Sequence, residues 1–290
     1  MIKNRKGIIL AGGFGTRLYP STVSISKQII PIYDKPMIYY PLSTLMEAGI
    51  KDILIISSPE HIKYFELLLK DGSQFGINIK YAIQHKPEGL AQALIIAEEF
   101  IDNKPSCLIL GDNIFYGAGL SQLLLKASLD GENTTIFSYQ VSDPKRFGVI
   151  EIDKNNNVLS IEEKPKKPKS SYAITGIYFY DEKAPNYAKD LLPSKRGELE
   201  ISDLNNVYLK KGNLKAIPLS KGYAWLDTGT PESLLEASNF IHTIEKRQGS
   251  KICCPEEIAL KQKWINKEEL LKNIHNINNP YNDYLKGLIE

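Results

Sequence analysis

The chain has 290 residues, of which 42% are hydrophobic and 24% are charged, and this balance excludes a disordered or fibrous protein. Its 36 basic and 34 acidic residues give a formal net charge of +2 and are spread along the chain, which argues against nucleic-acid binding and against a polybasic membrane patch. No window approaches 18 uninterrupted apolar residues, and the N-terminal residues lack the core of a signal peptide. We therefore expect a cytoplasmic protein.

The first part of the chain alternates strand-like and helical patterns, which is typical of a parallel sheet with crossover helices. Short apolar runs predict strands at residues 7–11, 52–57, 77–83 and 107–110. Apolar residues at i, i+3 and i+4 predict helices at about 36–48, 59–70 and 89–100. The expected architecture is a doubly wound α/β core.

The pattern changes after residue 112, where helical periodicity becomes sparser. Strands are predicted at 134–141, 148–152, 158–162 and 173–180, and we expect antiparallel additions at one sheet edge. The Asn- and Asp-rich segment 153–157 predicts a hairpin turn. A helix is expected at 231–248, with Thr230 as its cap and proline in its first turn.

The segment from Lys251 onward is helical in pattern and carries regularly spaced apolar residues. Such a tail must bury its apolar positions, either on its own core or on a neighbouring subunit, and the sequence leaves both open. Of the three cysteines, Cys107 lies in an apolar run, while Cys253 and Cys254 are adjacent without a second pair that would complete a metal site. Reduced, mostly buried thiols are therefore expected.

A glycine-rich turn follows the first predicted strand in the run IILAGGFGTRL. Glycines allow backbone N–H groups to approach an anion closely, and the planar guanidinium of Arg17 suits phosphate oxygens. The turn is not a dinucleotide-binding fingerprint, because Leu18 stands where the last glycine would be, and the chain has no Walker A motif. Lys27 is a candidate second cation. A plain tight turn and a solvated surface lysine are the alternatives.

The strings LAGGFGTRLYP and SKQIIPIYDKPMIYYPLSTLMEAGI resemble the glucose-1-phosphate thymidylyltransferase family of bacterial deoxysugar pathways, within the sugar nucleotidyltransferases. The resemblance continues over essentially the full length through IQHKPEGLAQAL, LGDNIFYG, GVIEID, EEKPKKPKS, YAITGIYFYD, RGELEISDLN, GYAWLDTGTPESLLEASNFI and CPEEIALKQKWI. It implies a Rossmann-like, three-layer α/β/α nucleotidyltransferase fold with a mixed, mainly parallel sheet. We expect a core at 1–250, with a nucleotide-binding part at about 1–112 and a sugar-phosphate-binding part at about 113–230, and a helical extension at 251–290.

The resemblance also implies an enzyme that transfers a thymidylyl group from dTTP to α-D-glucose 1-phosphate, giving dTDP-glucose and pyrophosphate, the first step of dTDP-deoxysugar biosynthesis. Arg17 and Lys27 would be the catalytic cations. Gln84 carries an amide that can pair with the imide edge of thymine or uracil but not in that pattern with cytosine. The nucleotide-binding residues implied are Gly12, Gly13, Gly15, Thr16, Arg17, Lys27, Gln28, Gln84 and Gly89.

Two aspartates are candidate metal ligands. Asp112 follows a buried strand at the edge where open α/β sheets bind ligands, and Asp227 lies beside a turn of small residues. Convergent carboxylates and a nucleotide phosphate suit Mg²⁺. A capping or turn role is the alternative for each, and the resemblance favours the metal.

The resemblance assigns the sugar phosphate to Asn113, Gly148, Glu163, Lys164 and Ile174. A solvated ion pair is the alternative for the glutamate and the lysine. The chain departs from close relatives at Phe147, where they commonly carry tyrosine, so a hydroxyl contact is missing there.

Two other functions compete with this interpretation. A uridylyltransferase is close, because thymine and uracil differ by a methyl group that is worth only roughly 1 to 3 kcal/mol in an apolar pocket. A nucleotide-sugar sensor without turnover is the second, and the complete set of Arg17, Lys27, Asp112 and Asp227 argues against it. The resemblance further implies a homotetramer with feedback inhibition by a dTDP-sugar such as dTDP-rhamnose.

Overall fold

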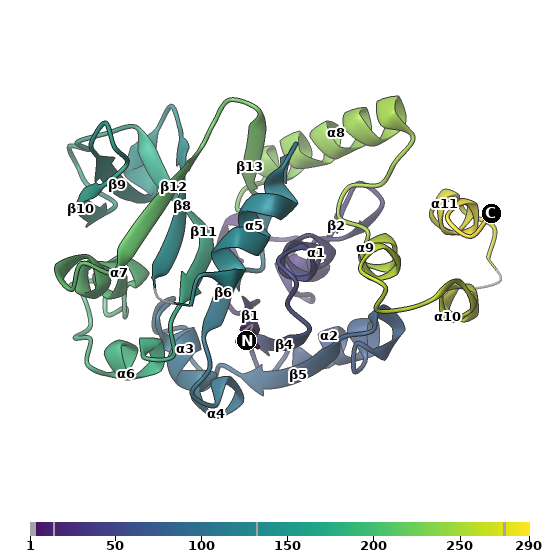
Figure 1. Ribbon diagram of the computed structural model, residues 1–290, viewed down its shortest axis with the longest axis horizontal. Helices are drawn as coiled ribbons and strands as arrows, with labels where there is room; N and C mark the ends of the chain where they lie inside the picture. The colour runs from purple at the N-terminus through teal and green to yellow at the C-terminus, as the bar shows by residue number, and fades with distance from the viewer. Residues whose placement is uncertain (1–3, 14, 132, 275–276) are drawn as a thin grey trace.

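The computed structural model describes residues 4–13, 15–131, 133–274 and 277–290 (Figure 1). Its central sheet has nine strands, which are β1 (Lys6–Leu10), β4 (Asp52–Ser57), β5 (Asn78–Ile83), β6 (Ser106–Leu110), β8 (Thr134–Gln140), β9 (Gly148–Ile152), β10 (Val158–Glu163), β11 (Tyr172–Tyr180) and β12 (Leu214–Leu219). Two small two-stranded sheets accompany it, one of β2 (Pro31–Ile32) and β3 (Lys35–Pro36), the other of β7 (Asn113–Gly117) and β13 (Tyr223–Asp227).

Helices surround this sheet. They are α1 (Tyr39–Glu47), α2 (Ile62–Leu69), α3 (Gln92–Ile96), α4 (Glu98–Ile101), α5 (Leu120–Leu129), α6 (Ala184–Lys189), α7 (Ile201–Lys210), α8 (Pro231–Gln248), α9 (Pro255–Lys261), α10 (Lys267–Asn273) and α11 (Pro280–Gly287). Among the described residues, none of these helices is long and apolar enough to cross a membrane.

The sheet order is β10-β9-β11-β6-β1-β4-β5, and β8 pairs with both β11 and β12. The half formed by β5, β4, β1 and β6 is parallel, as the alternation of strands and helices predicts. Strand β11 runs antiparallel to β6, β8 and β9, and β10 runs antiparallel to β9. The mixed α/β fold and the antiparallel additions at one edge are therefore confirmed.

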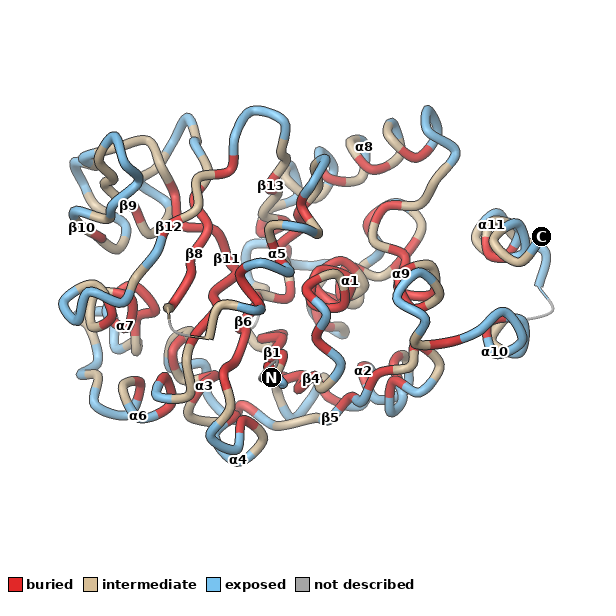
Figure 2. The backbone as a smooth tube through the Cα atoms, in the orientation of Figure 1, coloured by how far each residue is buried: buried red, intermediate tan, exposed pale blue. Residues whose placement is uncertain are grey.

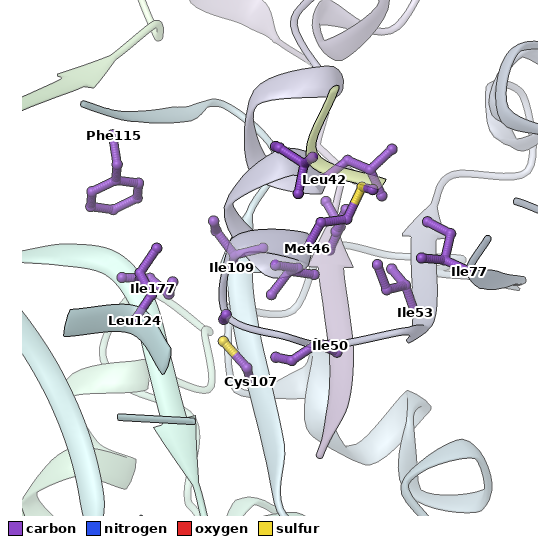
Figure 3. Close-up of a cluster of buried hydrophobic side chains, with 14 of the residues drawn as sticks. Leu42, Met46, Ile50, Ile53, Ile77, Cys107, Ile109, Phe115, Leu124 and Ile177 are labelled. Carbon is purple, nitrogen blue, oxygen red and sulfur yellow. The ribbon is translucent and has the colours of Figure 1, made fainter. Parts of the chain in front are cut away.

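The core lies on both faces of the sheet, because strand side chains alternate between them. Ile9 and Cys107 face one apolar cluster, which includes Leu42 of α1 and Leu124 of α5 (Figure 3). Ile8, on the opposite face, belongs to a second cluster that is completed by residues of α3, α6 and α7. Figure 2 accordingly draws the central strands mostly as buried. The predicted three-layer arrangement follows from these two clusters.

The helix predicted at 89–100 begins later and is divided into α3 and α4. Its first residues instead bond to an irregular segment, since the N–H of Ala91 donates to the carbonyl of Leu199 and the N–H of Leu199 donates to that of Glu88. Gly89 has a φ of +111°. Backbone bonding to residue 199 thus replaces the first helical turn that periodicity predicted.

The capping and turn predictions are confirmed. The Thr230 hydroxyl accepts the N–H of Ser233 at the start of α8 at 3.2 Å. Asp153 accepts the backbone N–H of Asn155 and of Asn157, both at 2.8 Å, in the hairpin between β9 and β10. Asn156 adopts the left-handed conformation that asparagine tolerates, with a φ of +63°.

The C-terminal segment packs on its own chain. Helix α9 lies against α1, and Ile258, Ala259 and Leu270 belong to the same apolar cluster as the α1 side chains. Leu271 remains 58% exposed. Cys107 and Cys254 are buried free thiols and Cys253 is half-buried, as expected. The division at residue 250 stays a prediction.

Candidate active site

The glycine-rich turn lies at the carboxyl end of β1. Gly13 and Gly15 have φ values of +97° and +57°, so both need the freedom of glycine. The Thr22 hydroxyl donates to the carbonyl of Gly15 at 2.9 Å and closes the loop. Arg17 follows in a short 3-10 helix, Thr16–Leu18, and its guanidinium lies against Gly229, where an added Cβ would stand 2.6 Å from Nη2. The turn thus brings Arg17 to the segment that follows β13.

The two candidate metal ligands converge from different strands. Asp112 follows β6 directly, Asp227 ends β13, and the pairing of β7 with β13 places Asp227 opposite Asn113. The carbonyl of Asp112 accepts the hydroxyl of Thr228 at 2.9 Å and its N–H at 3.2 Å. This double contact holds the two carboxylate-bearing segments together.

Each carboxylate has a cation beside it. The Lys27 ammonium forms an ion pair with Asp112. Burial alone would raise the pKa of the Asp112 carboxyl, but attraction to Lys27 and hydrogen bonds from Lys27 and Asn113 outweigh it and hold the pKa below its usual range. Arg146 lies 3.8 Å from Asp227 through its Nη2. Each of the two aspartates therefore has a cationic side chain as its partner.

The proposed sugar-phosphate residues gather in a cavity of about 260 Å³. Asp112 and Asp227 also line this cavity, together with Arg17, Asn113, Gly148, Glu163, Lys164 and Ile174. Within it, Oε2 of Glu163 accepts the hydroxyl of Ser202 at 2.5 Å. A Cβ at Gly148 would stand 2.9 Å from that hydroxyl oxygen, so the glycine leaves room for the contact.

A second hollow adjoins the first and shares residues with it. Its lining includes Gly13, Gly15, Thr16, Arg17, Lys27, Lys164 and Asp227. The glycine turn, both predicted catalytic cations and one carboxylate thus meet at a single opening at the carboxyl edge of the sheet. This is the edge at which open α/β sheets bind ligands.

Four predicted nucleotide-binding residues do not line either hollow. Gln84 follows β5 and is only 5% exposed, and its Oε1 lies where a Cβ of Gly12 would be. Gln28 is 1% exposed and packs its Cγ under Gly111, so its side chain supports the site from behind. At Gly89, a Cβ would overlap the main chain of Leu199, so close packing alone requires glycine at this position.

Comparison with known proteins identifies the family to which the chain belongs. A model described as "Nucleotidyl transferase" matches residues 6–244 of the chain. The chain belongs to the nucleotidyl transferase family. Enzymes of this family generally use a divalent metal, and the chain is a nucleotidyltransferase.

Its relatives are similar over almost their whole length. A glucose-1-phosphate thymidylyltransferase of Xanthomonas campestris pv. campestris (strain B100) is 58% identical over 285 residues, which cover 98% of this chain and 97% of the relative. The enzyme of the same name from Mycobacterium tuberculosis (strain CDC 1551 / Oshkosh) is 50% identical over 287 residues, 98% of this chain and 99% of the relative.

Solved structures agree in fold. A Bacillus anthracis protein assigned as a glucose-1-phosphate thymidylyltransferase, in complex with a sucrose, is 45% identical, with a TM-score of 0.75 over 81% of this chain and 94% of that one. A UDP-glucose pyrophosphorylase complexed with UDP-glucose is 25% identical, with a TM-score of 0.73 over 84% of this chain and 100% of that one.

The donor set of this nucleotidyltransferase suits a hard cation with few protein ligands. Within the described residues, no three His, Cys, Asp or Glu side chains form a cluster that could hold a metal by themselves. Two carboxylates that line one cavity with the cationic side chains of Arg17 and Lys164 fit Mg²⁺, which keeps several waters and takes substrate phosphates as further ligands.

Sequence reasoning missed several polar side chains that line the main cavity or its neighbour, and four of them are Arg146, Arg196, Ser202 and Trp225. Arg196 lies 3.7 Å from Glu163 and 3.5 Å from Glu200 through its Nη1. Three of the four lie within the motifs RGELEISDLN and GYAWLD that carried the resemblance, and Arg146 directly precedes Phe147. Each could have been singled out from those motifs.

Proposed function

We propose that the chain transfers a thymidylyl group from dTTP to α-D-glucose 1-phosphate, giving dTDP-glucose and pyrophosphate. Relatives of that name at 50% and 58% identity, which span nearly the whole chain, support this substrate pair. The observation that carries the proposal is the shared cavity, in which Asp112 and Asp227 stand with Arg17 and Lys164. Two carboxylates beside two phosphate-binding cations suit the joining of two phosphate compounds.

The attacking group is already charged, because a sugar phosphate oxygen is ionised at neutral pH. The reaction therefore needs no Ser, His or Cys base, and catalysis consists of positioning and charge. Arg17 and Lys27 offset the repulsion between the two anions and stabilise the charge that develops on pyrophosphate. In-line attack on the α-phosphorus implies inversion there, and retention with a chiral α-thiotriphosphate would contradict it.

Asp112 and Asp227 are the proposed ligands of Mg²⁺. When bound, this ion neutralises charge on the triphosphate. Lys27 pairs with Asp112 and holds that carboxylate ionised before substrate enters, and Arg146 lies beside Asp227. Magnesium dependence is tested by adding a chelator and restoring activity with Mg²⁺.

The sugar phosphate occupies the main cavity in this proposal. Lys164 holds its phosphate, and Glu163 accepts hydrogen bonds from the sugar hydroxyls. Asn113, Gly148 and the backbone at Ile174 line the remaining surface. The ring of Phe147 stands 5.2 Å from that of Trp225, so it supplies shape at this position without a hydroxyl.

The triphosphate of the nucleotide occupies the second hollow in this proposal, and the base extends beyond the hollow toward Gln84. The backbone of Gly12, Gly13, Gly15 and Thr16 faces its phosphates, and Gln28 packs under Gly111 behind the site. Gln84 reads the pyrimidine, with Gly89 on the same side. The core at 1–250, the extension at 251–290, the homotetramer, the feedback inhibition by a dTDP-sugar and the cytoplasmic location stay predictions.

Product analysis tests the proposal. The purified chain, incubated with dTTP, glucose 1-phosphate and Mg²⁺, is expected to form dTDP-glucose, which ³¹P nuclear magnetic resonance identifies by its diphosphate signals. Folded protein that binds dTTP without forming product would instead support the sensor function. Asp112→Asn is the matched inactive variant, since it keeps size and removes charge.

A further inference from the structure

Gln84 is the last member of a row of side chains behind the proposed base site. Its Nε2 donates to Oε1 of Gln92 at 2.6 Å. Nε2 of Gln92 in turn donates to Oε2 of Glu88 at 2.8 Å. The backbone N–H of Glu88 donates back to the same Oε1 of Gln92 at 3.1 Å. We call these three residues the amide relay.

The direction of every bond in the amide relay is fixed at its Glu88 end. A backbone N–H can only donate and an ionised carboxylate can only accept, whereas a glutamine amide has one end of each kind. The N–H of Glu88 therefore selects Oε1 of Gln92, and the Glu88 carboxylate selects its Nε2. The amide of Gln92 has a single orientation that satisfies both partners.

This orientation passes to Gln84. Because Oε1 of Gln92 already faces it as an acceptor, Gln84 must turn its own Nε2 toward Gln92. Its Oε1 then points away from Gln92 and lies over the backbone of Gly12. A Cβ added to Gly12 would overlap this oxygen. The N–H of Gln84 donates to the carbonyl of Ser57 at 2.8 Å, which fixes the main chain below.

The end of the Gln84 amide that faces away from Gln92 is thus an acceptor with a donor beside it. No described residue donates a hydrogen bond to Oε1 of Gln84, and one hydrogen of its Nε2 is free of the bond to Gln92. A pyrimidine with an N3–H and a neighbouring carbonyl, as in thymine and uracil, matches this pair of groups. Cytosine offers an acceptor at N3 and an amino group at C4, and it would match only a reversed amide.

We infer that Gln92, oriented by Glu88, is the positioning residue that makes the site select thymine and uracil against cytosine. The inference rests on the proposed function, in which Gln84 faces the base. Gln92 does not touch the nucleotide in this account. Gln92 prevents the Gln84 amide from rotating by half a turn into the orientation that would bind cytosine.

The test compares dTTP with CTP in two ways: as kcat/KM with glucose 1-phosphate, and as equilibrium affinity by calorimetry without the sugar phosphate. Gln92→Met keeps the length of the side chain and removes both of its hydrogen-bonding ends. We expect the preference for dTTP over CTP to fall about fivefold to tenfold, as the loss of a hydrogen bond to a polar group allows. The fall should come mainly from KM, with kcat for dTTP within about threefold of the parent, because Gln84 does not contact the reacting atoms.

The double variant Glu88→Gln with Gln92→Glu separates polarity from packing. The introduced carboxylate is acceptor-only, so it still accepts from Gln84 and from the backbone N–H at residue 88, while the introduced amide donates to it. Gln84 keeps its orientation, and the dTTP preference should stay within about threefold of the parent. The double variant keeps the net charge, and Glu99→Gln, an exposed change on α4 outside the relay, is a control that should leave the preference unchanged.

Among the variants, two results would overturn the inference: an unchanged preference in Gln92→Met, or a double variant that loses the preference as far as Gln92→Met does. Circular dichroism establishes that each variant is folded. A parent chain that binds dTTP far more tightly than CTP but shows no turnover would contradict the proposed function alone, since the affinity series still tests the relay. A parent that binds both equally would overturn the inference.

Discussion

The indole N–H of Trp225 donates to Oδ1 of Asn113 at 2.6 Å, and it determines which end of that carboxamide faces Asp112. The N–H of Gly176 donates to the same oxygen at 3.1 Å. With its oxygen held by two donors, Asn113 turns Nδ2 toward Asp112 and donates to Oδ1 at 3.0 Å. Trp225 thus acts on the carboxylate of Asp112 through a neighbouring amide.

Trp225→Phe removes the indole N–H together with the five-membered ring and keeps a six-membered aromatic ring in the core, so it should weaken this arrangement. A hydrogen bond of this kind contributes about 0.5 to 1.5 kcal/mol, so we expect kcat to fall about twofold to tenfold. Affinity for Mn²⁺, measured by electron paramagnetic resonance, should weaken alongside. Trp264→Phe, in the C-terminal segment, is the matched control and should change neither quantity.

Arg17→Ala and Lys27→Ala should each lower kcat by about 10²-fold to 10³-fold, by analogy with the loss of one charge-stabilising group in other active sites. Steady-state pyrophosphate release measures both. Lys166→Ala, in the exposed loop after Lys164, should leave the rate unchanged. Losses of less than about tenfold in both active-site variants would mean that the phosphates bind elsewhere.

A buried ion cluster ties α8 to the C-terminal segment. Glu245, which is 6% exposed, accepts Lys35 and Lys251 at 3.0 Å each, and it also accepts the N–H of Ile252 at 2.8 Å. Glu245→Gln leaves two buried ammonium groups without this carboxylate. Asp34 still pairs with both lysines, so we expect the free energy of unfolding to fall by about 1 to 3 kcal/mol, measured by urea denaturation.

The control for this change is Glu236→Gln, an exposed position on the same helix. It should alter the free energy of unfolding by less than about 0.5 kcal/mol. Equal effects of the two substitutions would show that burial of the cluster does not matter.

Glu47 should make stability depend on pH near neutrality. Burial raises the pKa of its carboxyl to about 7; Lys261 opposes the rise and Glu257 adds to it. Between its ordinary value of 4.5 and this value the folded chain holds a proton that the unfolded chain has released. The free energy of unfolding therefore falls as pH rises through this window, by up to about 3 kcal/mol.

Glu47→Gln removes this proton. Relative to the parent, the variant should gain stability as pH is raised from 5 to 7.5, which parallel denaturation series will measure. A parent-to-variant difference that stays constant over this range would contradict the raised pKa.

Much of the fold follows from local pattern, and the failures have physical causes. Strand β4 and helix α8 carry their own signals, in an unbroken apolar run and in the Thr230 cap. The start of α3 could not be read from periodicity, because backbone bonds to Leu199, a residue far along the chain, replace its first turn. Strands β7 and β13 escaped prediction because they pair only with each other and flank the site.

In the candidate site, too, some residues can be predicted from local pattern and others cannot. Arg17, Asp112 and Asp227 stand out because glycine turns and strand ends expose functional groups. Gln92 and Thr228 do not, because an amide in a helical run and a threonine in a turn are unremarkable until their partners are known. Their parts depend on contacts with Gln84 and with the Asp112 carbonyl.

Pyrophosphate release with glucose 1-phosphate and Mg²⁺, compared for dTTP, UTP, CTP, ATP and GTP at equal concentration, tests the central claim most directly. The account predicts release with dTTP, a lower or similar rate with UTP, and none with the purine nucleotides or CTP. Release that favours a purine nucleotide or CTP would contradict the role of Gln84. No release with any of the five, from folded protein, would contradict the proposed function.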